Sequence, residues 1–280
     1  EILKMLYRNN DILIFDEPTA VLTPQEIDEL METMRGFARE NKSILFISHK
    51  LNEIMAISDR VTILRKGKCI GTSTNKRELS TLMVGHPVQL EVEKEEAQPK
   101  DVVLSVRNLT VPSRIHKSEA VKDVSFDVRQ GEIVCIAGID GNGQTELIQG
   151  LTGLEKISGG EITLCGQNIS KAGIRARSEA GFSYIPEDRH KHGLILDFTL
   201  KENLVLQKFR DKQFQKNGFI RFDEVRRYAD QLIEQYDVRS GQGADTVVRS
   251  MSGGNQQKAI IARELDRNKP LVIAVQPTRG

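Results

Sequence analysis

The chain has 280 residues, of which 39% are hydrophobic and 28% charged, and its formal net charge is +1. This balance is ordinary for a globular protein, and it argues against nucleic-acid binding, which favours a basic surface. No apolar run approaches the ~18 residues that a membrane-spanning helix needs. Cys69, Cys135 and Cys165 are widely spaced, so we expect buried free thiols in a reducing compartment, not disulfides or a zinc site.

The first part of the chain alternates apolar strands with helices. Residues 12–16 and 43–47 are apolar runs that predict buried parallel strands. Between them, residues 23–26 read Thr-Pro-Gln-Glu, the expected start of a capped helix. We also expect a helix over 51–57 and a hairpin around Lys66-Gly67.

A charged stretch divides the chain into two predicted domains, 1–88 and 102–280. Residues 91–100 are rich in Glu and Lys and lack apolar periodicity, so we place a linker at 89–101. Apolar residues at helical spacing predict helices over residues 200–237. Residues 260–265 are predicted to be the last part of a helix that leads to a strand at Leu271. Further strands are predicted at 102–106, 120–128, 133–137 and 161–164.

One motif occurs twice, 259 positions apart, as ILIFDEPT and as LVIAVQPT. Val275 replaces Asp16 in the second copy, and Gln276 replaces Glu17. Two carboxylates at the end of a buried strand are costly unless they act on a metal or a water. The first copy therefore predicts a hydrolytic site, and the second predicts a site that has lost its acids.

A glycine-rich loop follows the predicted strand at 133–137 and precedes a predicted helix. Its spacing is that of a Walker A phosphate loop, whose backbone N–H groups cradle phosphate. Gln144 stands where that motif has Lys, so a full positive charge is missing, while the Thr145 hydroxyl can still contact Mg²⁺. Glycines also occur in plain turns, but the flanking strand and helix favour a phosphate loop. The candidate nucleotide ligands are Gly138, Gly141, Asn142, Gly143, Gln144 and Thr145.

Residues 252–258, Ser-Gly-Gly-Asn-Gln-Gln-Lys, form a second candidate anion site at a helix start. The two glycines leave the backbone bare, and Ser252 can cap the helix. An ordinary capped helix is the alternative, but the position 13 residues before the strand at Leu271 favours a functional role. The candidate ligands are Ser252, Gly253, Gly254 and Gln256.

His49 follows the strand at 43–47 and lies 32 residues after Glu17. A core histidine would be the expectation for this residue alone, but beside an acidic strand end it can contact a γ-phosphate. His190 and His192 could suggest a metal site. No further ligands cluster near them in the sequence, so we expect solvated loop residues.

Together these motifs resemble the ATP-binding subunit of an ABC transporter, of the tandem type that serves sugar and nucleoside importers. The resemblance covers essentially the whole chain. Asp16 and Glu17 resemble Walker B, residues 21–23 the D-loop, His49 the switch histidine, and 252–256 the signature.

Residues 184–189 are similar to the Q-loop region of this subfamily, with Glu187 in place of Gln as a coupling residue. The VQPTRG stretch, with GNGQTE before it, looks closer to nucleoside importers than to sugar importers. No aromatic residue occurs between Ser105 and Ser125, so the usual adenine-stacking side chain is missing.

The resemblance implies an α/β P-loop NTPase fold with a core parallel sheet, an antiparallel β subdomain and a helical subdomain that holds the signature. Residues 1–88 would be the C-terminal part of a first nucleotide-binding domain. Residues 102–280 would be a truncated second one, with degenerate Walker motifs and an intact signature. The chain would thus be a fragment of a tandem protein, inactive by itself.

The resemblance also implies a mechanism and partners. ATP would lie between the phosphate site of one domain and the signature of the other, with Asp16 holding Mg²⁺, Glu17 polarising water and His49 contacting the γ-phosphate. The second ATP site would be degenerate. The implied partners are integral-membrane permease subunits and an extracellular or periplasmic substrate-binding protein, with no nucleic acid, at the cytoplasmic face of the cell membrane.

Two other classes remain as alternatives. A soluble tandem ABC ATPase acting on ribosomes or DNA would favour two intact sites, a basic linker or a long coiled coil. Here the linker is acidic, and only 65 residues separate Glu187 from Ser252. A purely structural or regulatory fragment is disfavoured by Asp16, Glu17 and His49.

Overall fold

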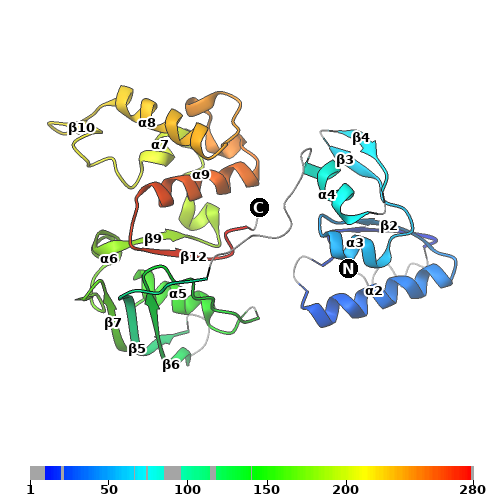
Figure 1. The fold of residues 1–280 in the computed structure, drawn as a ribbon, viewed down its shortest axis with the longest axis horizontal. Coiled ribbons are helices and arrows are strands. Elements are labelled where there is room, and N and C mark those ends of the chain that lie inside the picture. The colour runs from blue at the N-terminus through cyan, green and yellow to red at the C-terminus, as the bar shows by residue number, and fades with distance from the viewer. Residues whose placement is uncertain are drawn as a thin grey trace. The chain divides into compact units, whose positions relative to one another are not determined.

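The computed structural model describes residues 10–19, 22–65, 67–73, 75–84, 96–113, 118–139 and 141–278. The chain separates into two compact units, Glu1–Glu96 and Ala97–Gly280, which are described separately (Figure 1). This boundary falls inside the predicted linker, but residues 89–95 lie outside the described ranges. The domain assignment based on family resemblance therefore stays a prediction.

Unit 1 is built on two parallel strands, β1 (Ile12–Asp16) and β2 (Ser43–Ile47), in register from Ile12↔Ser43 to Asp16↔Ile47. Helix α2 (Pro24–Arg39) begins with the predicted capping box of Thr23 and Glu26 and packs Leu30 and Met34 against one face of the strands. The remaining elements are α3 (Leu51–Ile57), the antiparallel pair β3 (Ile63–Arg65) and β4 (Lys68–Gly71), and α4 (Lys76–Val84).

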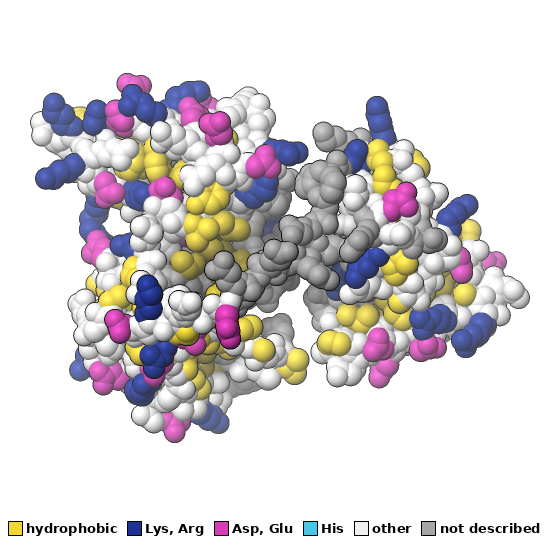
Figure 2. All heavy atoms as spheres, viewed as in Figure 1, with side chains coloured by type: hydrophobic (Ala, Val, Ile, Leu, Met, Phe, Trp, Pro, Cys, Tyr) yellow, Lys and Arg dark blue, Asp and Glu magenta, His cyan; other side chains and the backbone are white. Residues whose placement is uncertain are grey.

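The opposite face of the β1–β2 pair is exposed, so the prediction of buried strands is wrong for this face. Hydrophobic side chains reach the surface of each unit in the view of Figure 2. In unit 1 the exposed hydrophobic residues include Ile12 and Ile14. Their repeat counterparts Leu271 and Ile273 pack in a core cluster that includes Leu147 of a helix. No described helix plays that part in unit 1, which explains the exposure.

Unit 2 opens with a four-stranded antiparallel sheet in the order β6-β5-β7-β8. Its core packs Val106, Leu109 and Ile162 against Leu147 and Leu151 of α5 (Gln144–Thr152). The antiparallel β layer thus buries the helix that follows the phosphate loop. The strands are β5 (Val102–Pro112), β6 (Glu119–Arg129), β7 (Gly159–Leu164) and β8 (Gln167–Asn168).

A parallel pair, β9 (Phe182–Ile185) and β12 (Leu271–Ala274), joins this layer to a helical region. Both α6 (Ile174–Gly181) and α9 (Gly253–Asp266) contact β9. The helical core includes Leu200, Leu232 and Ile260. Its other elements are the π-helix η1 (Arg189–Gly193), α7 (Leu200–Val205), β10 (Gln215–Lys216), β11 (Phe219–Ile220), α8 (Phe222–Gln235), and the 3-10 helices η2 (Gly243–Asp245) and η3 (Val248–Ser250).

The strand predicted at 133–137 does not form, and residues 132–139 are irregular with Ile133 exposed. A strand needs a neighbour to take its backbone hydrogen bonds. Among the described strands, β9 and β12 pair only with each other. Residues 132–139 have no such neighbour among the described strands.

The prediction that the cysteines are buried is also wrong, because all three free thiols are exposed. Cys69 lies on the outer face of the β3–β4 hairpin, Cys135 lies in the irregular segment, and Cys165 occupies a turn with φ of 49°. No described helix is long and apolar enough to cross a membrane.

Candidate functional site

The phosphate loop, Glu187 and the degenerate motif line one pocket of unit 2, with a volume of about 890 Å³. Gly138, Gln144 and Thr145 line it, as do Val275 and Gln276, which follow β12. Residues separated by 130 or more positions in the sequence therefore meet, as a nucleotide site built on strand ends requires. Asp140 lies outside the described residues.

The backbone of the loop needs its glycines. Gly141 and Gly143 have φ of 85° and 92°, values that favour glycine. A Cβ added at Gly143 would lie 2.6 Å from the Ala120 carbonyl oxygen. Gly143 also begins α5 without a side-chain cap, which leaves helix N-terminal N–H groups for an anion. Asn142 is exposed beside it.

Gln144 folds back over the start of the loop. Its Nε2 donates a hydrogen bond to the Ile139 carbonyl at 3.1 Å, and a Cβ added at Gly138 would overlap the same nitrogen. The side chain is neutral and tied to the loop itself. The pocket therefore has the shape of a phosphate site without the cation that a Walker A lysine supplies.

The two copies of the repeated motif share one unusual backbone geometry. Glu17 has φ of 44° and its counterpart Gln276 has φ of 45°, a left-handed conformation that residues other than glycine seldom adopt. Such strain tends to cluster at functional sites. The backbone has therefore been kept in the second copy while the carboxylate chemistry has changed.

In unit 1 the predicted catalytic residues lie together. Nδ1 of His49 lies 2.8 Å from Oε1 of Glu17, and the two side chains are 67% and 50% exposed. Asp16 is exposed at the end of β1, and its carboxylate shows no hydrogen bond or ion pair with the described part of the chain. It is thus available as an oxygen ligand. Of the predicted D-loop, Val21 lies outside the described residues.

The predicted signature forms the first turn of α9, with two differences from expectation. Ser252 is the N-cap residue, but its Oγ accepts a hydrogen bond from Asn255 Nδ2 at 2.9 Å instead of capping the helix. Gln256 is buried, and its amide contacts His190 Nε2 at 3.0 Å and the Val248 carbonyl at 2.9 Å. Gln256 therefore takes part in the packing of α9, and its role as a nucleotide ligand, like those of Ser252, Gly253 and Gly254, stays a prediction.

His190 and His192 are both exposed, as predicted, but they lie in the π-helix η1, and His190 Nε2 also contacts Gln256 of α9. Asp188 accepts hydrogen bonds from the backbone N–H groups of Lys191 and His190, which hold the pKa of its carboxyl below the usual range. Burial, and secondly the charge of Glu187, raise the pKa of Tyr184. Within the described residues no cluster of three or more His, Cys, Asp or Glu side chains suits a metal ion.

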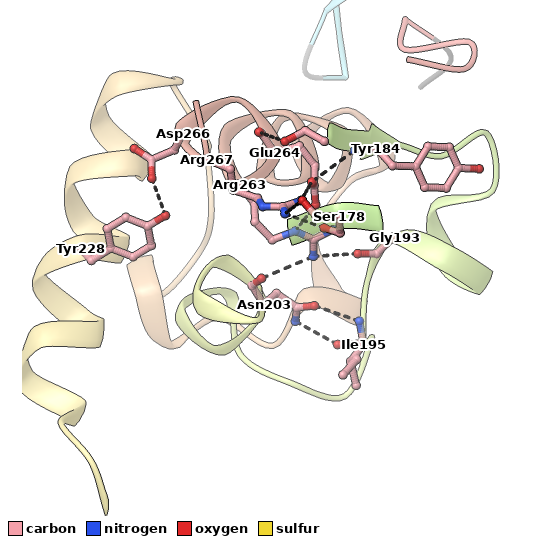
Figure 3. Close-up of polar contacts among 11 residues, drawn as sticks. Ser178, Tyr184, Gly193, Ile195, Asn203, Tyr228, Arg263, Glu264, Asp266 and Arg267 are labelled. Carbon is pink, nitrogen blue, oxygen red and sulfur yellow. Dashed lines mark hydrogen bonds and ion pairs between the residues drawn. The ribbon is translucent and has the colours of Figure 1, made fainter. Parts of the chain in front are cut away.

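A buried ionic network fixes the far half of α9 (Figure 3). Glu264 accepts from Arg263 Nε at 2.9 Å and from Arg267 Nη1 at 3.0 Å, and Arg263 also donates to the Gly193 carbonyl at 2.8 Å. Arg267 reaches Ser178 Oγ on α6 at 2.6 Å. The sequence does not reveal this network, because alternating charges near a helix end usually indicate a solvated face.

Residues 121–279 match the family model described as ABC transporter. The chain belongs to that family. It is 51% identical to the nucleoside import ATP-binding protein NupA of Lactococcus lactis subsp. cremoris and 53% identical to the guanosine import ATP-binding protein NupO of Bacillus subtilis. It is 38% identical to the ribose import ATP-binding protein RbsA 1 of Streptomyces avermitilis. These matches cover 100% of the chain but 56%, 55% and 52% of those proteins, so the chain spans about half their length.

Solved structures agree on the fold. A dimeric bacterial ABC transporter cassette matches with a TM-score of 0.52 at 24% identity, covering 62% of this chain and 74% of that one. A nucleotide-free ATP-binding cassette from an ABC transporter matches with a TM-score of 0.51 at 21% identity, covering 64% and 71%. The α/β fold of the P-loop ABC ATPases is therefore confirmed.

Proposed function

We propose that the chain is part of the ATP-binding subunit of an ABC importer for a nucleoside or a simple sugar, with one competent and one degenerate ATP site. The observation that carries the proposal is the contact of 2.8 Å between His49 and Glu17, next to Asp16 at a strand end. The names of the relatives support the substrate class, nucleosides before sugars.

In the competent site the substrate is ATP bound to Mg²⁺. Asp16, an exposed carboxylate, suits Mg²⁺, which prefers oxygen ligands and keeps several waters. Glu17 accepts the proton of the attacking water as general base. Because His49 contacts Glu17 through Nδ1, its Nε2 is left for a γ-phosphate oxygen. Hydrolysis then depends on three side chains from the ends of β1 and β2.

In the degenerate site the loop at 138–145 still offers backbone N–H groups, and Thr145 a hydroxyl. Gln144 brings no charge, Val275 no metal ligand and Gln276 no base. Electrostatic stabilisation of the developing charge is the largest part of phosphoryl-transfer catalysis. We therefore assign this pocket to weak or static nucleotide binding without turnover.

The proposed partners are membrane permease subunits and a substrate-binding protein, with this subunit peripheral at the cytoplasmic face. A second pocket of unit 2, about 680 Å³, includes Tyr184, Leu206 and Phe209 in its lining. Glu187, three residues after Tyr184, lines the nucleotide pocket. The segment 184–187 thus touches both pockets, which suits a coupling role between ATP and a permease segment.

The test is Glu17→Gln in the full-length subunit assembled with its permease. Removal of a general base costs about 10²–10⁴-fold in rate, while ATP binding should persist because Asp16 keeps the metal. Glu29→Gln, on the exposed side of α2, makes the same chemical change as a matched control. A Glu17→Gln rate close to wild type would refute the assignment. Uptake of labelled guanosine against labelled ribose then decides the substrate class.

A further inference from the structure

The contact between Glu17 and His49 is made by two exposed side chains from different segments. Glu17 follows β1 and His49 follows β2, and they are 50% and 67% exposed. Exposed side chains keep rotamer freedom and do not hold one geometry by themselves. Beyond the C-terminal ends of the two strands, the described backbone links these segments through one hydrogen bond, from Glu17 N–H to the Ile47 carbonyl at 2.9 Å. Something else must fix the pair.

A buried polar cluster lies next to the pair, centred on the Glu53 carboxylate of α3. Thr19 and Glu53 are 2% and 7% exposed. Glu53 Oε2 accepts from Thr19 Oγ1 at 2.7 Å and from Ser48 Oγ at 3.1 Å. Its Oε1 lies 3.1 Å from Lys50 Nζ, which also donates to the Thr19 carbonyl at 3.0 Å. Both carboxylate oxygens are therefore occupied.

The partners of Glu53 bracket the catalytic pair. Thr19 comes two residues after Glu17, and Ser48 and Lys50 are the neighbours of His49 on either side. We propose that Glu53 is a positioning residue of the ATPase site, with Thr19 as its link to the Glu17 segment. The proposal rests on the proposed function, since it assigns Glu53 a part in the same reaction.

The chemistry of the cluster supports positioning over plain stability. A carboxylate buried among partners is often no more stabilising than an apolar side chain of similar size. It does fix the orientation of the groups that donate to it, because each hydrogen bond has a preferred distance and angle. Catalysis is sensitive to such placement, and a displacement of about 1 Å can lower the rate 10²-fold. Because Glu53 is buried and both its oxygens are paired with neighbouring side chains, we expect its loss to act on kcat and not on KM.

The experiment uses the full-length subunit with its permease and compares Thr19→Val with Thr19→Ser. Valine removes the hydroxyl at similar volume, and serine keeps it. Thr19→Val should lower kcat about tenfold with KM for ATP within about twofold, whereas Thr19→Ser should stay close to wild type. Glu53→Gln should give a similar loss. The double variant should be no worse than the more affected single variant, because Thr19 acts through Glu53 and the contact between them can be lost only once.

Three results would overturn the inference: wild-type kcat for Thr19→Val, equal impairment of Thr19→Ser and Thr19→Val, or a KM that rises as kcat falls. If circular dichroism shows that Glu53→Gln is unfolded, the comparison of Thr19→Val with Thr19→Ser decides whether the inference holds. Glu17→Gln is measured alongside. If Glu17→Gln keeps full activity, the proposed function fails and this inference fails with it. If Glu17→Gln is inactive while the Thr19 and Glu53 variants match wild type, only this inference fails.

Discussion

The buried carboxylate of Glu264 should contribute strongly to the stability of unit 2. Arg263 and Glu264 are 3% and 2% exposed, and Glu264 is the acceptor for both Arg263 and Arg267. In Glu264→Gln the amide oxygen can still accept a hydrogen bond from one arginine. The amide NH₂ is a donor, so it then faces the other arginine without accepting from it. A hydrogen bond to a charged group is worth about 1.5–3 kcal/mol, and breaking a buried pair costs about 3–5 kcal/mol.

Two features place the expected loss near the lower end of that range. Arg263 keeps carbonyl acceptors at Gly193, 2.8 Å, and Asn203, 3.4 Å, and Arg267 keeps Ser178. We therefore expect Glu264→Gln to lower the free energy of unfolding by about 3 kcal/mol. This is a large part of the ~5–15 kcal/mol that holds a domain together, yet it should leave the native state populated.

Urea unfolding of the 280-residue chain, followed by tyrosine fluorescence, measures this loss. The chain has no tryptophan, and three of its four tyrosines, Tyr184, Tyr228 and Tyr236, lie in unit 2. The matched control is Glu179→Gln, whose ion pair with Arg175 at 2.7 Å is 62% and 64% exposed. Exposed pairs of this kind contribute about 0.3–0.5 kcal/mol.

The result that refutes the reasoning is a midpoint shift for Glu264→Gln as small as that for Glu179→Gln, at unchanged m-value. The buried network would then contribute nothing beyond a surface pair. A change in the m-value instead would mean that the compactness of one state had changed, and the comparison would be repeated by thermal unfolding.

Two further predictions concern catalysis. The 280-residue chain by itself should release no phosphate from ATP, because it contains no lysine-bearing phosphate loop; steady turnover that Glu17→Gln abolishes would contradict this. In the full-length subunit blocked by Glu17→Gln, Gln144→Lys should change nucleotide affinity at the second site without adding hydrolysis, since Val275 and Gln276 supply neither metal ligand nor base. Hydrolysis at the second site should require Val275→Asp and Gln276→Glu in addition. Substantial ATPase activity from Gln144→Lys alone would mean that other residues supply the metal ligand and the base.

The sequence by itself determined the features that depend on residues close together in the chain. The capping box of Thr23 and Glu26 formed as predicted because both partners lie within one helical turn. The loss of acids in the second copy of the motif was visible at Val275 and Gln276 without coordinates. These patterns were sufficient to indicate the family, because a strand, a turn and the side chains they present are specified locally.

Only the tertiary structure decided what depends on segments distant in sequence. It brought His49 to Glu17 and placed Glu53 between their segments. It also buried Gln256, which the motif alone presented as a ligand. The burial and pairing of a side chain depend on which segments pack together. The charge of one residue therefore does not say whether its partner is water or a carboxylate 30 positions away. For the same reason residues 132–139, apolar enough for a strand, stayed irregular, since none of the described strands pairs with them.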